Sequence, residues 1–259
     1  GAAPSFQEIP GGAPQPYAAV LLFDQSLSII RNDPTDARLY SAKEFLRGLG
    51  GSDVGAMAAF AYDQGTLIPE APVTLYPVGA PAFFSDGTQL FADLDSLADL
   101  EGGRTPLYEA LCRTMDFAAA QAPAGVRQAV VLFTDGQNDV GVTPGFSCLT
   151  LEQAIQRSQT AGVDVFTVGL SGEVDGRVLA TLADAGNGVF LFAEDVSQLI
   201  PIYGSLATLL SGSLTSYRLT FRIGAAADGT FQAGRSVLGR LSVDTGTNPV
   251  VLPFVVRIF

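Results

Sequence analysis

The sequence of 259 residues contains no histidine. Ser-His-Asp and Cys-His catalytic sites need an imidazole as the base, so hydrolases of that usual construction are excluded. Zinc held by histidine and histidine-based pH switches are excluded for the same reason. The two cysteines cannot complete a four-thiolate metal site, which leaves either one disulfide or two free thiols.

Basic residues are also scarce. Fourteen Lys and Arg stand against 26 Asp and Glu, the formal net charge is −12, and Lys43 is the only lysine. This charge repels phosphate backbones and anionic lipid surfaces, so no nucleic-acid partner is predicted. No apolar run reaches the ~18 residues that cross a bilayer, so no membrane insertion is predicted. Cations and basic partners are favoured instead.

Apolar segments with strand character alternate with helical patterns between residues 17 and 211. The predicted strands are 17–23, 53–62, 126–134, 163–170 and 188–193, and the predicted helices are 35–48, 93–100, 106–121, 150–161, 175–185 and 195–211. The proline-rich segment 64–88 is predicted as an edge hairpin or a long loop. This alternation predicts an α/β fold with a doubly wound, mostly parallel sheet.

The pattern changes at both ends of this region. Residues 1–16 are rich in Gly, Pro and Ala and are predicted as an N-terminal arm or loop. Residues 214–223, 236–243 and 250–258 alternate with period two and have no helix between them. We therefore predict three parts: the arm 1–16, the α/β domain 17–211 and a C-terminal antiparallel β extension 212–259.

Three oxygen-bearing residues follow the first predicted strand. Asp24, Ser26 and Ser28 alternate in the run Asp-Gln-Ser-Leu-Ser, directly after seven mostly apolar residues. One carboxylate and two hydroxyls on one side of a short loop are the oxygen ligands that Mg²⁺ prefers. In parallel sheets ligands bind beyond the carboxyl ends of the strands, where this run lies.

Two later segments offer further oxygens. Thr105 stands between Gly102-Gly103-Arg104 and a predicted helix, where it is either a metal ligand or a helix N-cap. Asp135 ends the strand 126–134 and precedes Gly136, where it is either a ligand or a turn aspartate. The sequence predicts that Asp24 and Asp135 lie at the same edge of the sheet.

Together these residues resemble the von Willebrand factor type A (VWA) domain family over about 17–211. Its metal-ion-dependent adhesion site (MIDAS) combines an Asp-x-Ser-x-Ser loop, a Thr loop and an Asp-Gly loop. The resemblance implies a Rossmann-like fold with an intact MIDAS formed by Asp24, Ser26, Ser28, Thr105 and Asp135. It implies Mg²⁺ or Mn²⁺ as the bound ion, with Ca²⁺ as a third candidate, and the last coordination position filled by an Asp or Glu carboxylate of a protein ligand.

Other polar residues near these loops are given smaller roles. Gln25 is predicted to contact the partner. Glu109 lies one helical turn beyond Thr105 and is predicted at the surface, outside the metal shell. The acidic residues between 93 and 101 are predicted to form a solvated face, because they lack the spacing of an EF-hand.

Cys112 lies in the helix after Thr105, and Cys148 follows the loop after Asp135. Because both loops converge near the predicted site, a disulfide is geometrically reasonable, and two free thiols are the alternative. A disulfide would indicate an oxidising compartment. We therefore predict an extracytoplasmic location (secreted, periplasmic or cell-surface) in a bacterium.

The leading functional hypothesis is a non-enzymatic, metal-dependent protein-binding domain for adhesion or scaffolding. A regulatory or scaffold subunit of a larger assembly, such as an ATPase partner, is the alternative; the chain itself has no P-loop. A Mg²⁺-dependent phosphatase-like hydrolase with Asp24 as nucleophile is disfavoured, because it needs a second carboxylate where Ser26 stands.

Overall fold

The computed structural model describes residues 5–9, 12–62, 72–140, 145–171, 174–212, 216–220, 236–244 and 249–257. The chain divides into two compact units, one of Pro10–Thr215 and one of Gly1–Ile9 with Ser216–Phe259. This grouping differs from the division predicted from the sequence, because part of the predicted arm, residues 5–9, forms a strand that pairs with the C-terminal segment.

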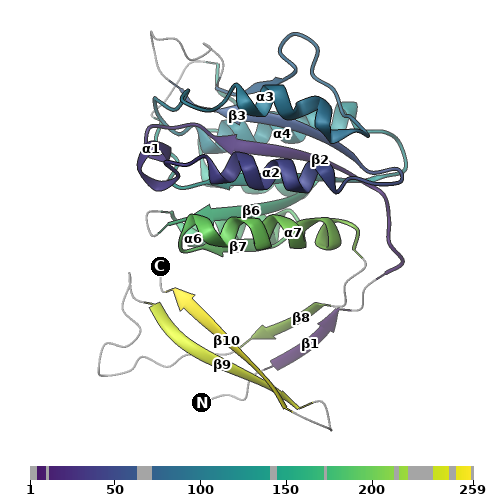
Figure 1. The fold of residues 1–259 in the computed structure, drawn as a ribbon, viewed down its shortest axis with the longest axis vertical. Helices are drawn as coiled ribbons and strands as arrows, with labels where there is room; N and C mark the ends of the chain where they lie inside the picture. The colour runs from purple at the N-terminus through teal and green to yellow at the C-terminus, as the bar shows by residue number, and fades with distance from the viewer. Residues whose placement is uncertain are drawn as a thin grey trace. The chain divides into compact units, whose positions relative to one another are not determined.

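The larger unit contains a six-stranded sheet in the order β4-β3-β2-β5-β6-β7 (Figure 1). Its strands are β2 (Tyr17–Asp24), β3 (Val54–Phe60), β4 (Thr74–Tyr76), β5 (Arg127–Thr134), β6 (Asp164–Leu170) and β7 (Phe190–Ala193). All neighbours are parallel except the edge strand β4, which is antiparallel to β3. The α/β fold with a mostly parallel sheet is confirmed. Residues 64–71 of the predicted edge segment lie outside the described residues.

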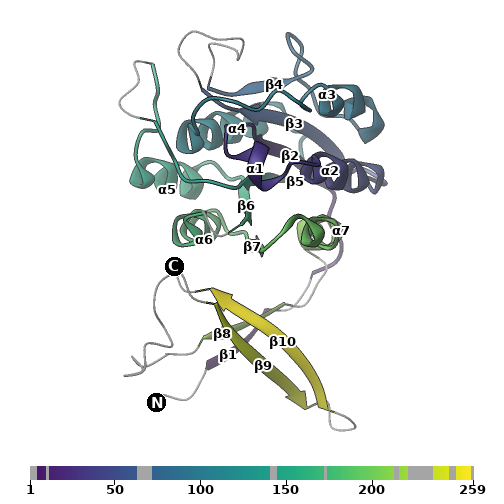
Figure 2. The same ribbon diagram turned by 60° about the vertical axis from the view of Figure 1, so that its left-hand side comes forward.

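Helices cover both faces of this sheet (Figure 2). They are α1 (Ile29–Asn32), α2 (Ala37–Arg47), α3 (Phe91–Asp95), α4 (Leu107–Gln121), α5 (Leu151–Thr160), α6 (Gly176–Ala185) and α7 (Leu199–Leu210), with 3-10 helices at Gly87–Leu90 and Val196–Gln198. Figure 2 shows α2, α3 and α7 on one face and α4, α5 and α6 on the other. Every residue of β2 is buried, as expected for a central strand covered on both sides.

The two ends of the larger unit are hydrogen-bonded to each other. Gly12 N donates to Gly212 O at 2.9 Å, and Gln15 N donates to Ser211 O at 3.0 Å. The guanidinium of Arg127, at the start of β5, donates to the carbonyls of the last two residues of α7 at 3.1 and 2.9 Å. These bonds satisfy carbonyl groups that the end of a helix otherwise leaves without partners.

The smaller unit consists of antiparallel pairs. Strand β1 (Ser5–Ile9) pairs with β8 (Ser216–Thr220), and β9 (Ser236–Asp244) pairs with β10 (Pro249–Arg257). The C-terminal segment is therefore antiparallel β structure, as the period-two alternation predicted. Residues 221–223, the end of the first predicted strand, lie outside the described residues.

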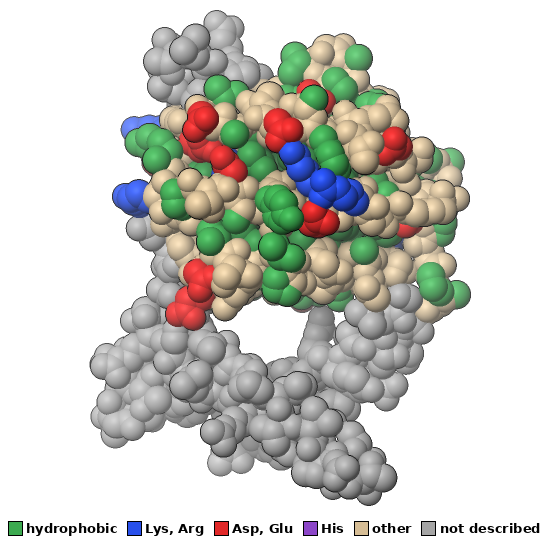
Figure 3. All heavy atoms as spheres, in the orientation of Figure 1, with side chains coloured by type: hydrophobic (Ala, Val, Ile, Leu, Met, Phe, Trp, Pro, Cys, Tyr) green, Lys and Arg blue, Asp and Glu red, His purple; other side chains and the backbone are tan. Residues whose placement is uncertain are grey.

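Acidic side chains are spread over the face of the larger unit that Figure 3 presents, and basic ones are few. Lys43 pairs with Asp95 and Arg47 pairs with Glu44, so these cations lie beside carboxylates. Within the described ranges, no helix combines the length and the apolar character needed to cross a membrane.

Candidate metal centre

The register of β2 and β5 brings two aspartates to the same edge of the sheet. These strands are adjacent and parallel, with Phe23 opposite Phe133. Asp24 is the last residue of β2, and Asp135 follows the end of β5. Thr134 Oγ1 donates a hydrogen bond of 2.5 Å to Asp24 Oδ2, which ties the two strand ends together. Both carboxylates thus lie at the carboxyl edge, where ligands bind in such sheets.

The loop after β2 continues this cluster. Ser26 N donates to Asp24 Oδ1 at 2.8 Å, which turns the loop back over the strand end. Ser26 Oγ lies 3.2 Å from Ser28 Oγ, and Ser28 Oγ donates to Asp135 Oδ1 at 2.8 Å. Asp24, Ser26 and Asp135 are buried, and Ser28 is half-buried. These four predicted metal ligands therefore form one continuous hydrogen-bonded group.

Thr105 reaches the same place from the start of α4. A Cβ built on Gly136 would lie 3.6 Å from Ser28 Oγ and 3.8 Å from Thr105 Oγ1. The two hydroxyls therefore surround one point beside Gly136. The absence of a side chain at Gly136 leaves this space open, and its backbone is not in the left-handed region, so room and not conformation is the reason for glycine here.

Thr105 is not the N-cap of α4, which was the alternative to a metal-ligand role. Pro106 is the N-cap residue of α4 and supplies no capping side chain. Asn138 Oδ1 instead accepts from Tyr108 N at 3.3 Å and so serves the first turn of the helix. Thr105 contributes its carbonyl to Asp139 N at 2.9 Å. Its hydroxyl lies on the side of Gly136.

Asp24 is buried close to a second carboxylate, that of Asp135. Burial, and then the charge of Asp135, raise the pKa of Asp24 to about 7, although hydrogen bonds from Ser26 and Thr134 act in the opposite direction. Within the described residues, none of the ion pairs involves Asp24. Buried charges of one sign need a counter-charge or a proton.

The residues present fit a divalent cation. The donors are two carboxylates and three hydroxyls, all oxygens, which suits a hard cation such as Mg²⁺ and not a soft one. In the part of the chain that the structure describes, no group of three or more His, Cys, Asp or Glu side chains could hold a metal. The candidate site agrees with that finding, because it contains only two such side chains.

Two neighbours of the site were missed by the sequence analysis. Asn32 Nδ2 donates to Asp135 Oδ2 at 2.8 Å, and Thr134 binds Asp24 as described. Asn32 belongs to α1, a helix too short to leave a periodic signal. Thr134 immediately precedes Asp135, but only the register shows that it lies level with Asp24.

The side chain of Gln25, predicted to contact the partner, points into the protein in this structure. The side chain of Gln25 is only 5% exposed, and its Nε2 donates to Leu97 O at 2.7 Å. Its Oε1 accepts from the guanidinium of Arg38 at 2.5 and 3.2 Å. The side chain therefore faces the protein interior. Leu27, two residues later, is 62% exposed and lies at the surface of the same loop.

Glu109 is also not at the surface, since it is only 1% exposed. Its Oε2 accepts from Ser147 N at 2.8 Å and from Cys148 N at 2.7 Å, and its Oε1 accepts from Arg113 Nε at 2.7 Å. Burial raises the pKa of this carboxyl, but these hydrogen bonds and the Arg113 charge lower it overall. Glu109 thus fixes the segment after the Asp135 loop onto α4.

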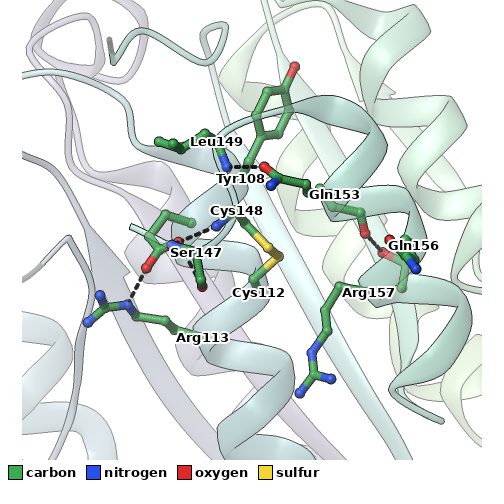
Figure 4. Close-up of a disulfide and its surroundings, with 12 residues drawn as sticks. Tyr108, Cys112, Arg113, Ser147, Cys148, Leu149, Gln153, Gln156 and Arg157 are labelled. Carbon is green, nitrogen blue, oxygen red and sulfur yellow. Dashed lines mark hydrogen bonds and ion pairs between the residues drawn. A yellow bond between two sulfur atoms is a disulfide. The ribbon is translucent and has the colours of Figure 1, made fainter. Parts of the chain in front are cut away.

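Cys112, on α4, and Cys148, just before α5, form a disulfide (Figure 4), and the backbone N–H of Cys148 binds Glu109. Helix α5 then begins with a capping box, in which Thr150 and Gln153 bind each other's backbone. The disulfide, the buried carboxylate and the capping box act on neighbouring residues. They anchor the chain on the far side of the Asp135 loop.

A small hollow of about 80 Å³ lies beside Gly136, between the first turns of α4 and α6. Its lining residues are Leu107, Tyr108, Gly136, Gln137, Asn138, Asp175, Val178 and Leu179. Burial, and then the charges of Asp175 and Glu152, raise the pKa of Tyr108. The hollow lies next to the candidate metal centre and has one acidic side chain, Asp175, in its lining.

The model of the von Willebrand factor type A domain matches residues 20–204 of the chain. The chain belongs to the VWA domain family. No curated protein sequence matches it. The six-stranded, mostly parallel sheet between two helical layers is the fold of this family, and the matched residues include all five side chains of the candidate centre.

Solved structures with the same fold come from several sources. A von Willebrand factor type A protein of Catenulispora acidiphila is 18% identical with a TM-score of 0.56, over 79% of this chain and 49% of that one. Proximal thread matrix protein 1 of the mussel byssus, solved with a zinc-occupied MIDAS motif, is 17% identical with a TM-score of 0.55, over 83% and 49%. The pilus adhesin SpaC of Lactobacillus rhamnosus GG is 15% identical with a TM-score of 0.60, over 80% and 32%.

These identities show the fold alone. The chain spans about half the length of the first two structures and about a third of the adhesin.

Proposed function

We propose that this VWA domain binds a divalent cation through Asp24, Ser26, Ser28, Thr105 and Asp135, and uses it to bind a carboxylate of a protein partner. The observation that carries the proposal is the hydrogen-bonded group formed by the two serines with Asp135, next to buried Asp24. Mg²⁺ or Mn²⁺ is the proposed ion, since hydroxyl and carboxylate oxygens suit hard cations, and Ca²⁺ is a third candidate.

The chain's own residues prepare the site for such an ion. Because Ser28 donates its proton to Asp135, it accepts from Ser26, and one lone pair of its oxygen remains available to a cation. Thr134 and Ser26 N hold the two oxygens of Asp24 in fixed directions. The three hydroxyls carry no formal charge, so a bound ion keeps enough positive charge to attract an anionic oxygen. Asp or Glu of a partner supplies such an oxygen.

We propose binding and not catalysis. A carboxylate nucleophile must contact its substrate directly, whereas the side chain of Asp24 is fully buried. The phosphatase-like alternative also needs a second carboxylate at the position of Ser26.

We also propose an extracytoplasmic location in a bacterium, as part of adhesion or scaffolding. The disulfide between Cys112 and Cys148 supports an oxidising compartment. A bacterial pilus adhesin and a mussel matrix protein are among the structures with the same fold, which is consistent with this role.

Thermal and chemical unfolding in Mg²⁺, Mn²⁺, Ca²⁺ and EDTA tests the metal part of the proposal. For the wild type, Mg²⁺ at about a hundred times its Kd is expected to add about 2.7 kcal/mol to the free energy of unfolding. Asp24→Asn keeps the shape of the side chain and removes one of two buried charges. It is expected to be at least as stable as the wild type in EDTA and to gain nothing from Mg²⁺. An equal gain for both proteins would contradict the proposal.

Partner binding is tested with immobilised wild-type and Asp24→Asn protein in parallel. A partner captured by the wild type in Mg²⁺ is expected to be lost in EDTA and with the variant. Replacing one Asp or Glu of that partner by Asn or Gln is expected to abolish capture. Retention by Asp24→Asn in EDTA would show that binding does not use the metal centre.

A further inference from the structure

A buried arginine, Arg38, binds Gln25 in the first loop of the proposed metal centre but is not one of the proposed ligands. Its side chain is completely buried near the start of α2. A guanidinium removed from water needs partners for all of its N–H groups. The five acceptor contacts that it makes are to Gln25 Oε1 from Nε at 3.2 Å and from Nη2 at 2.5 Å, to Asp33 Oδ2 at 3.0 Å, to Asp36 Oδ1 at 2.8 Å and to Glu101 Oε1 at 2.6 Å.

Two of these partners belong to different metal-binding loops. Gln25 stands between the ligands Asp24 and Ser26. Glu101 stands at the start of the segment that leads to Thr105. Nη2 of Arg38 contacts both, at 2.5 Å and 2.6 Å, so one nitrogen joins the first loop to the second.

Backbone bonds run parallel to this connection. Gly102 N donates to Gln25 O at 2.8 Å, and Leu27 N donates to Gly103 O at 3.2 Å. Backbone hydrogen bonds therefore connect the two loops on both sides of Ser26. Arg38 supplies the only side-chain link between them among the hydrogen bonds of the described residues.

The first loop is held in place at Gln25 by every polar group of that residue. Gln25 N donates to Phe60 O at 2.9 Å and its Nε2 donates to Leu97 O at 2.7 Å. Its Oε1 is committed to Arg38. Since α2 is a rigid helix packed on the sheet, Arg38 relates the loops to the body of the fold and not only to each other.

We infer that Arg38 is a positioning residue that sets the spacing between the serines of the first loop and Thr105, and thereby the affinity of the site for its cation. The inference rests on the proposed metal site. Glu101 is the partner of Arg38 on the second loop. The sequence predicted this residue on a solvated face, but its side chain is only 10% exposed and is bound to Arg38.

The geometry explains why arginine and not lysine occupies this position. The bridge needs several donors pointing in fixed directions toward Gln25, Glu101 and Asp33 at once. The planar guanidinium provides such a fork, whereas an ammonium is a single compact centre. Arg38→Lys therefore keeps the charge but cannot hold both loops.

The test compares Mn²⁺ affinity, by electron paramagnetic resonance titration, in Arg38→Lys, Glu101→Gln and Arg127→Met. Arg127→Met is the matched control, because Arg127 also forms an ion pair and helix contacts, but at the opposite end of β5 from Asp135. Arg38→Lys is expected to weaken Mn²⁺ binding about tenfold and Glu101→Gln about threefold. Arg127→Met is expected to bind Mn²⁺ as the wild type does, even if its unfolding midpoint in EDTA falls further than that of Arg38→Lys.

The outcomes separate the inference from the proposed function. If the wild type binds no Mn²⁺, the proposed function fails. If the wild type binds Mn²⁺ and Glu101→Gln or a folded Arg38→Lys binds it equally well, Arg38 is structural only and the inference is overturned. Glu101→Gln decides the matter where Arg38→Lys does not fold, because Glu101 is at the edge of the buried group and its amide variant keeps the shape of the side chain.

Discussion

The hydroxyl of Ser28 donates a hydrogen bond of 2.8 Å to Asp135 Oδ1, joining residues 107 positions apart in the chain. This side-chain bond joins the loop after β2 directly to the turn after β5. It is therefore sensitive to anything that separates the two strand ends or fills the space between them. Gly136 borders this space.

Gly136→Ala is expected to weaken Mg²⁺ or Mn²⁺ binding about tenfold while changing the free energy of unfolding in EDTA by less than about 1 kcal/mol. The new methyl group would stand 3.6 Å from Ser28 Oγ and 3.8 Å from Thr105 Oγ1, which are ordinary van der Waals distances, so the fold is not strained. The methyl group would, however, occupy the space beside both proposed ligands. Isothermal titration with each ion measures the effect.

Gly204→Ala is the control for this variant. A Cβ at Gly204, within α7, meets nothing within 4 Å. The substitution is expected to stabilise the helix by about 0.5–1 kcal/mol and to leave the metal affinity unchanged. Unchanged affinity in Gly136→Ala as well would mean that the two hydroxyls do not bind a cation at this point.

Glu109→Gln is expected to reduce stability at neutral pH by about 1–3 kcal/mol, because a buried carboxylate that accepts hydrogen bonds from Cys148 N, Ser147 N and Arg113 loses its charge. The pKa of Glu109 is lower in the folded chain than its ordinary value of 4.5. The folded state therefore holds its proton less tightly than the unfolded state. The stabilisation is complete above the ordinary pKa and is lost as the pH falls through the lowered one.

Urea unfolding of the wild type and Glu109→Gln between pH 7 and pH 3 checks this sign. The difference in free energy of unfolding between the two proteins is expected to be constant above about pH 5.5 and to shrink in acid. A difference that grows as the pH falls would refute the assignment.

Replacing both Cys112 and Cys148 by Ala is expected to lower the free energy of unfolding by roughly 3–4 kcal/mol, since the disulfide closes a loop whose ends are 36 positions apart. Because Glu109 and the capping box still hold this segment, the folded variant is expected to retain its Mg²⁺ response. Labelling of the unreduced, unfolded wild type with a thiol reagent is the companion experiment, and modification of both cysteines would show that the thiols are free.

Tyr203→Phe is expected to leave stability unchanged or to raise it by up to about 1 kcal/mol. In the described part of the chain the hydroxyl of Tyr203 is buried and has no hydrogen-bond partner. Removing such a group costs little, because its desolvation has no compensating bond. Thermal unfolding of Tyr203→Phe, beside Tyr17→Phe with its similarly placed hydroxyl, measures the effect. A loss above about 1 kcal/mol would reveal a partner for the hydroxyl.

The strands that carry Asp24 and Asp135 could be predicted because long apolar runs end at each aspartate. Their meeting could be inferred as well, since the carboxyl ends of parallel strands share one edge of a sheet. The short β1 could not be found, because its partner β8 lies more than two hundred residues later and five residues carry too little pattern.

Side-chain direction was the other failure, and Gln25, Asn32 and Glu109 illustrate it. Each is polar and lies in or beside a loop or in the first turns of a helix, where a polar side chain is usually exposed. Gln25 and Glu109 are turned inward, by Arg38 and Leu97 for the first and by the backbone beside Cys148 for the second, and half-buried Asn32 is directed at Asp135. No local pattern encodes such a pairing, because it depends on how the loops fold over one another.

The bonds from Gly12 to Gly212 and from Gln15 to Ser211 have a mechanical consequence. The chain enters and leaves the six-stranded unit at neighbouring points, so a force that pulls Gly12 away from Gly212 is borne by these few backbone bonds. The sheet and the candidate metal centre at its carboxyl edge lie outside that line of force.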